Sequence, residues 1–263
     1  MKIQLLSDLH LETEDYTPQA APGAHLLVVA GDVDSTWAGL DLFANWPVPV
    51  VYVAGNHEFD GRDIDEATQA LRERCRQLGL TMLERDTCVL TAPDGRRIRF
   101  AGTVRWSDFD LLGEAQRARC VRAAGYYVKV MKATRAGQIF DPAAVREESL
   151  RCREWLTDTL AQTAPLDDVG RPAWDLTVAI THYAPSPHSA DPRYGLQPGT
   201  ASFCNDDEDL MPGATLWVHG HLHCRHDYVV DHAQGQTRVV SNARGHSKRG
   251  EAEGHNGLFT IDI

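Results

Sequence analysis

The sequence predicts an α/β fold in which buried strands alternate with helices. Five short apolar runs rich in Val, Ile and Leu are typical of strands buried on both faces; they cover residues 3–6, 26–30, 48–54, 176–180 and 216–218. Helical periodicity separates the runs in the early half of the chain, as an α/β fold requires. With 263 residues, 43% of them hydrophobic, the chain can bury a core without disulfides.

Two helices have clear signals in the sequence. Over residues 63–78, apolar side chains recur at 64, 67, 71, 75 and 78, and Gly79 stands where a helix C-terminus is expected. Asp141 and Pro142 suit the N-cap and the first position of a second helix, which we expect to end near Gln162.

The remaining elements follow from shorter patterns. A strand is expected over residues 96–103, and strand-like segments at 227–230, 237–240 and 258–263 suggest the antiparallel part of a second sheet. No repeat or linker rich in Pro, Gly and Ser divides the chain. We therefore expect one domain over residues 1–263, with a mostly helical, cap-like insertion at about 105–165.

Composition excludes several classes of protein. The net charge of −11 disfavours non-specific binding to nucleic acid or to an anionic membrane, and no apolar run is long enough to span a bilayer. The six cysteines form no CxxC pair, so we expect reduced thiols rather than a zinc ribbon or a redox motif. The first apolar stretch is too short for a signal peptide, which predicts a cytoplasmic protein.

Each of the five apolar runs ends in Asp, Asn or His. The residues at these ends are Asp8 and His10, Asp32, Asn56 and His57, His182, and His221 and His223. Ligands of open α/β sheets gather beyond the carboxyl ends of the strands, so these ends are expected to converge on one crevice.

The residue types at this crevice indicate a metal centre. Asp8 and His10 are two residues apart, and an extended backbone would point both side chains to the same side; His221 and His223 repeat this spacing. Carboxylate oxygen and imidazole nitrogen together suit Mn, Fe, Zn or Co. Seven donors are too many for one tetrahedral ion but suit two ions that share a carboxylate, and paired ions stabilise an in-line phosphoryl displacement.

Five sequence blocks carry a family resemblance. In order they are Asp8-x-His10, Gly31-Asp32, Gly55-Asn56-His57-Glu58, His182 and Gly220-His221-x-His223. This set resembles the calcineurin-like metallophosphoesterase superfamily, whose fold implies two packed mixed β-sheets flanked by helices. The alternative, a set of unrelated loop residues, would not be expected to give five blocks in the same order.

The resemblance implies a role for each residue. It gives a first ion to Asp8, His10, Asp32 and His223, and a second ion to Asp32, Asn56, His182 and His221, with Asp32 bridging. It places His57 against the substrate beside Asn56, where His57 stabilises the phosphoryl transition state or protonates the leaving oxygen. The implied nucleophile is a metal-bound hydroxide. Manganese is the first candidate for both ions, with iron, zinc, nickel or cobalt as alternatives.

Departures from the pattern narrow the expected substrate. The protein Ser/Thr phosphatases of this superfamily have one arginine shortly after the GD block and another just before GNH; here Val33 to Thr36 and Ala54 occupy these places. We therefore expect a phosphodiesterase acting on a small anionic phosphate ester. A phosphomonoesterase with the same site is the main alternative. A nuclease is disfavoured because the acidic charge argues against long nucleic acid, and a non-catalytic scaffold because no ligand is missing.

Residues outside the blocks receive weaker predictions. Asp34 is expected to orient His57. Residues 117–135 hold six Arg or Lys and no acid, which favours either a cap that steers an anionic substrate or an ordinary solvated helix face. Arg244 suits a phosphate contact or a structural turn equally, and His219 is expected to support the metal ligands. Six further histidines match no block and are expected at the surface or in local bonds: His25, His188, His226, His232, His246 and His255.

Overall fold

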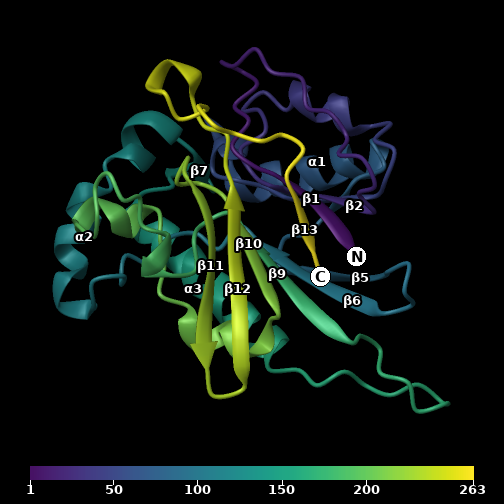
Figure 1. Ribbon diagram of the computed structural model, residues 1–263. Coiled ribbons are helices and arrows are strands. Elements are labelled where there is room, and N and C mark those ends of the chain that lie inside the picture. Colours follow the sequence, from purple (N-terminus) through teal and green to yellow (C-terminus); the bar gives the residue numbers. More distant parts are fainter.

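The computed structural model describes residues 1–263, and most of its strands form two mixed sheets (Figure 1). The first sheet has the order β13-β1-β2-β3-β4 and consists of β1 (Lys2–Leu6), β2 (Leu26–Ala30), β3 (Val50–Val53), β4 (Thr81–Met82) and β13 (Thr260–Asp262). The second has the order β11-β12-β10-β9-β6-β5 and consists of β5 (Asp86–Thr91), β6 (Arg97–Thr103), β9 (Leu176–Thr181), β10 (Leu216–His219), β11 (Arg225–His232) and β12 (Gly235–Asn242).

The two sheets pack face to face through one apolar layer. Alternate residues of β1, such as Ile3 and Leu5, lie in the same buried cluster as Val178 and Ile180 of β9. The intervening residues of the central strands face the helices and are buried as well. Burial on both faces explains why these strands read as continuous apolar runs.

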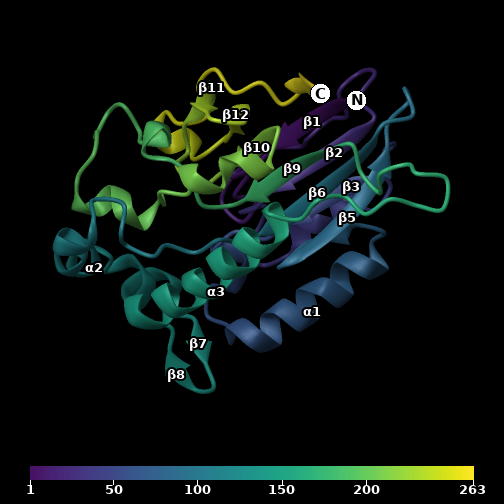
Figure 2. The same ribbon diagram turned by 90° about the horizontal axis from the view of Figure 1, so that it is seen from below.

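Helices cover the outer faces of the two sheets and complete the predicted helix–sheet–sheet–helix sandwich. Figure 2 shows α1 and α3 beside the strands. Helix α1 (Ile64–Gln77) packs Leu71 into the cluster beneath the first sheet, and α3 (Pro142–Leu160) packs Leu156 against Trp217 of the second. Both helices begin as their sequences require, because the carboxylates of Asp63 and Asp141 accept backbone N–H groups of the first turn. None of the helices combines the length and apolar character needed to cross a membrane.

Strand pairing differs from the expectation at the C-terminus. Residues 258–263 were expected in the second sheet, but β13 pairs antiparallel with β1 of the first, with Ile261 opposite Ile3. The physical reason is that Ile261 completes the apolar layer between the sheets. Of the other two C-terminal strands, β11 pairs antiparallel with β12 at one edge of the second sheet, whereas β12 runs parallel to β10.

The segment at 105–165 forms a wall beyond the sheet edge. It contains α2 (Arg117–Ala123), a π-helical turn (Tyr127–Met131), a small hairpin of β7 (Thr134–Arg135) and β8 (Gln138–Ile139), and α3. Helix α2 packs against the 3-10 helix Pro198–Ser202 from the loop that follows β9. These two chain segments therefore stand together over the carboxyl ends of the central strands.

Candidate metal centre

The strand ends that carry the predicted donors meet at one edge of the sandwich. The Asp8 carboxylate, after β1, accepts the backbone N–H of His221, after β10, at 2.9 Å. The backbone N–H of Gly220 in turn donates to the carbonyl of His182 at 3.0 Å. The first bond thus ties the first sheet to the second, and the second bond joins the ends of the neighbouring strands β10 and β9.

The backbone that presents these donors is left-handed rather than extended. Five of the seven donors have positive φ, namely Asp8 (54°), His10 (48°), Asp32 (52°), His221 (73°) and His223 (52°). The expectation of an extended backbone at the two i, i+2 pairs was therefore wrong. Each such residue costs of order 1 kcal/mol, a strain that clusters at functional sites and that Asp and His tolerate better than most residues.

Glycines in the same blocks allow the strand ends to approach. A Cβ on Gly55 would lie 2.1 Å from Oδ1 of Asp32, and one on Gly220 would lie 2.6 Å from Oδ2 of Asp8. Both separations are far shorter than van der Waals contact. The Gly-Asn and Gly-His dipeptides are thus required by crowding around the two carboxylates.

One group of donors contains Asp8, His10, Asp32 and His223, whose candidate ligand atoms all lie within 4.8 Å of one another. Nε2 of His10 faces Nε2 of His223 at 2.9 Å. The opposite ring nitrogens of these two histidines face Glu12 at 3.3 Å and Glu251 at 2.7 Å. A carboxylate behind the ring is the usual support of a metal-binding histidine.

A second group shares Asp32 with the first and adds His182 and His221. Nδ1 of His182 is 2.8 Å from the carbonyl of Ala30, which leaves Nε2 to face the site. Oδ1 of Asn56 lies 3.2 Å from that Nε2, so the amide joins the same group. The structure therefore brings all seven predicted donors together, although their binding of metal stays a prediction.

The chemistry of the donors fits two cations that share Asp32. Oδ2 of Asp32 is buried without a hydrogen-bond partner, 3.2 Å from Nε2 of His182 and 4.0 Å from Nε2 of His10. Burial raises the pKa of Asp32, but the neighbouring imidazoles of His182 and His57 outweigh it and hold the pKa well below its usual value. A buried, ionised and unpartnered oxygen between two sets of imidazoles is what a bridging carboxylate requires.

His57 belongs to neither donor group and faces the cavity. Nδ1 lies 2.7 Å from Oδ2 of Asp60, and Nε2 lies 2.9 Å from the Tyr126 hydroxyl. Burial lowers the pKa of His57, but Asp32 and then Asp60 outweigh it and raise the pKa to about 10. The structure thus makes Asp60 the residue that orients His57.

The expectation that Asp34 has this role is wrong. The Asp34 carboxylate accepts the backbone N–H groups of Thr36 at 2.7 Å and Gly39 at 2.8 Å. It shapes the loop after β2 and makes no bond to His57. Asp60 follows the GNHE block by only two residues, so local spacing could have suggested it as an alternative.

Two functional contacts had no clear signal in the sequence. The Tyr126 hydroxyl, from the wall at 105–165, accepts the Asn56 amide at 3.0 Å as well as meeting His57. Glu58, in the GNHE block, is fully buried and accepts the backbone N–H groups of Asp32, Val33 and Gly55 at 2.7–3.1 Å. Glu58 therefore clamps two donor loops together without facing the site.

A cavity of about 770 Å³ opens over the donors. Its walls combine aromatic, aliphatic and cationic side chains, among them Tyr126, Tyr127, Val130, Arg193, Phe203 and Arg249. Of the basic segment at 117–135, two tyrosines and Val130 line this cavity, whereas its arginines and lysines do not. The basic segment therefore contributes no cationic side chain to this cavity, whose lining also includes the carboxylates of Glu12, Asp60 and Glu251.

Three other predicted residues have defined places. Arg244 donates to Glu14 at 2.9 Å and to Ser247 at 3.0 Å, which is the structural alternative rather than a phosphate contact. Nε2 of His219 bonds the Ser189 hydroxyl at 2.9 Å beneath the site. His246, expected at the surface or in local bonds, instead stacks on His10.

The sequence matches the family model for calcineurin-like phosphoesterases over residues 1–225. Among solved structures, a phosphopantetheinyl hydrolase from Mycobacterium tuberculosis is similar with a TM-score of 0.69 and 18% identity, covering 99% of this chain and 95% of that one. A dimetal phosphatase from Danio rerio is similar with a TM-score of 0.50 and 12% identity, covering 91% and 86%. At these identities the two structures establish a common fold. The curated proteins contain no significant match.

Proposed function

Because the chain belongs to the calcineurin-like phosphoesterase family, we propose that it hydrolyses a small phosphodiester with the help of two divalent transition-metal ions. Asp32 supports this function most directly. Its orphaned oxygen lies between two groups of donors, one with Asp8, His10 and His223 and the other with Asn56, His182 and His221.

These residues would hold the ions through nitrogen and oxygen atoms, a set that suits manganese, iron, zinc, nickel or cobalt. When bound, such ions supply Lewis-acid stabilisation of the phosphoryl oxygens and activation of water. Asp32 belongs to both groups, so it fixes their relative position.

His57 is the residue placed to act on the substrate. Asp60 holds its ring from behind at 2.7 Å, and the other ring nitrogen points to the Tyr126 hydroxyl at the cavity wall. The proton on Nε2, which faces the Tyr126 hydroxyl in the free protein, can stabilise the phosphoryl oxygens or pass to the leaving oxygen when a substrate reaches this point. Tyr126 positions the ring from the side opposite to Asp60.

Two features of the cavity support the choice of a diester over a monoester in this proposal. A monoester carries two negative charges near neutral pH and a diester carries one. The cavity contains two arginines, and Arg193 is already paired with Asp191 at 2.6 Å. Val33 and Ala54, which stand near the places of the phosphatase arginines, are buried and apolar. The aromatic and aliphatic side chains next to the donors suit the second ester group that a phosphodiester carries and a monoester lacks.

Hydrolysis of bis-p-nitrophenyl phosphate and p-nitrophenyl phosphate tests the proposal. Purified protein is assayed with Mn²⁺, Fe²⁺, Zn²⁺, Ni²⁺, Co²⁺ and Mg²⁺ in turn, with Asp32→Asn as the control that loses the shared carboxylate. Metal-dependent turnover that favours the diester is the expected result. Phosphopantetheinyl esters belong in the next substrate panel, given the named activity of one structural relative.

Two other outcomes would change the assignment. Turnover of the monoester alone would favour a phosphatase with the same site. An absence of turnover with two ions bound would point to a narrower substrate or to a non-catalytic scaffold, whereas a failure to bind divalent ions would refute the metal centre itself.

A further inference from the structure

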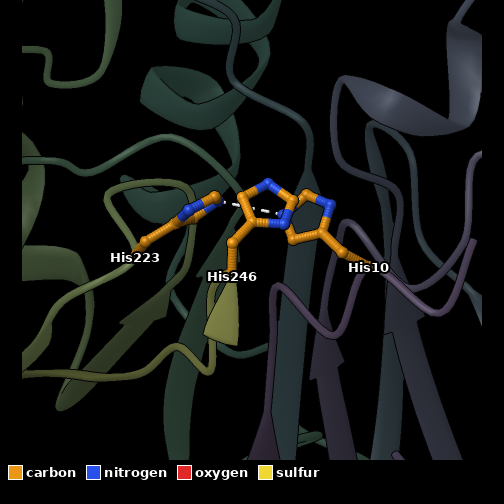
Figure 3. Close-up of side chains that lie close together, drawn as sticks. All are labelled: His10, His223 and His246. Atoms are coloured by element: carbon orange, nitrogen blue, oxygen red, sulfur yellow. Dashed lines mark hydrogen bonds between the residues drawn. The ribbon is translucent and has the colours of Figure 1, made fainter. Parts of the chain in front are cut away.

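A histidine outside the family blocks lies at the metal centre. The imidazole of His246 stacks on that of His10, with ring centroids 4.3 Å apart and planes inclined by 29° (Figure 3). Its centroid is 5.1 Å from that of His223. The candidate ligand nitrogens of His246, His10 and His223 all lie within 4.8 Å of one another.

The surroundings of His246 resemble those of the two predicted ligands beside it. His10 and His223 each have a glutamate facing Nδ1, and Nδ1 of His246 likewise faces Oε1 of Glu14 at 3.6 Å. The other oxygen of Glu14 accepts Arg244 at 2.9 Å and the Ser247 hydroxyl at 2.6 Å. Glu14 is thus a fixed carboxylate with one oxygen left for His246, the arrangement that orients metal-binding imidazoles.

The backbone around His246 is built to hold it there. Its N–H donates to Oε2 of Glu251 at 2.9 Å, the same oxygen that faces Nδ1 of His223. Gly245, at φ 69°, precedes it, and a Cβ there would lie 2.8 Å from Cβ of His223. This loop therefore packs directly against the loop that carries His223.

We propose that His246 is a further ligand of the ion held by Asp8, His10, Asp32 and His223. The inference rests on the proposed function, because it requires that ion. A third imidazole gives this position more nitrogen donors than the family blocks provide, which favours zinc, iron, nickel or cobalt over magnesium there. The two ion positions would then differ in metal preference.

Metal binding tests the inference without reliance on activity. Co²⁺ and Zn²⁺ are titrated calorimetrically into metal-free wild type, His246→Ala, His223→Ala and His188→Ala, and the visible absorption of bound Co²⁺ is recorded. His188 is an exposed histidine, with 68% of its side chain accessible, that does not line the cavity and serves as the matched control. We expect His246→Ala to lose at least about tenfold in affinity for one of two ions, since even groups behind a ligand contribute that much.

The outcomes separate the two proposals. The proposal is supported if the wild type binds two ions and His246→Ala binds one of them more weakly, with a changed Co²⁺ spectrum. His188→Ala should show neither change. Wild-type affinities and spectrum in His246→Ala would refute it while leaving the metal centre intact. Absence of divalent-ion binding by wild type would refute both proposals.

A measurement on the wild type removes dependence on the folding of a variant. NMR of ¹⁵N-histidine-labelled protein loaded with Zn²⁺ reports which ring nitrogens are metal-bound. In the wild type we expect five metal-shifted imidazoles, those of His10, His182, His221, His223 and His246. A spectrum in which only His10, His182, His221 and His223 are shifted would overturn the proposal.

Discussion

Replacing Asp60 with Asn should slow hydrolysis while leaving the metal content unchanged. Oδ2 of Asp60 lies 2.7 Å from Nδ1 of His57, and Asp60 belongs to neither donor group. Asn is nearly isosteric, but it removes the negative charge that holds the ring and supports its protonated form. The change therefore acts on His57 alone.

The size of the effect follows from the contact. A hydrogen bond between charged groups contributes about 1.5–3 kcal/mol. The two side chains are 20% and 26% exposed, so solvent screening places this one at the lower end. A loss of about 1.4 kcal/mol from transition-state stabilisation corresponds to about a tenfold decrease in kcat.

Steady-state hydrolysis of two diesters measures the effect and its origin. If His57 protonates the leaving oxygen, Asp60→Asn slows diphenyl phosphate more than bis-p-nitrophenyl phosphate, because phenol is the poorer leaving group. Asp158→Asn is the matched control and should leave kcat unchanged, since Asp158 is exposed on α3 and does not line the cavity.

Either of two results would refute the reasoning. An unchanged kcat in Asp60→Asn would mean that the hydrogen bond does not orient His57 for the reaction. Loss of bound metal would mean that Asp60 supports the donors instead of His57.

Three further predictions concern residues around the site. Tyr126→Phe removes the hydroxyl 2.9 Å from His57 and should lower kcat by up to about tenfold with metal content unchanged, as measured by steady-state kinetics and elemental analysis; an unchanged kcat would contradict a positioning role. Glu58→Ala leaves three buried N–H groups without their acceptor, which should cost at least about 3 kcal/mol of unfolding free energy and lower Tm by about 6–12 °C in a thermal melt; a wild-type Tm would contradict the clamp. The double change Arg119→Glu and Arg122→Glu should leave kcat/KM and its salt dependence unchanged, because both side chains are exposed and neither lines the cavity; a decrease that high salt abolishes would instead favour substrate steering.

Much of the fold was predictable because it depends on local patterns. The central strands are buried on both faces, so they appear in the sequence as apolar runs, and α1 and α3 carry their capping residues beside them. The strands at the margins were harder. β5 has alternating exposure at a sheet edge, and β13 is three residues long and finds its place by packing Ile261 against the opposite sheet.

The sequence by itself determined which residues stand at the strand ends, because parallel strands bring the polar residues that follow them to one edge. Tertiary structure alone decided how these residues are supported. Tyr126 reaches His57 from the wall at 105–165, and His246 of the C-terminal loop stacks on His10. Such contacts join residues that are far apart in the sequence, as His10 and His246 are. They depend on how loops pack in space and on left-handed backbone angles at the donors, and neither is encoded in the spacing of residues along a strand.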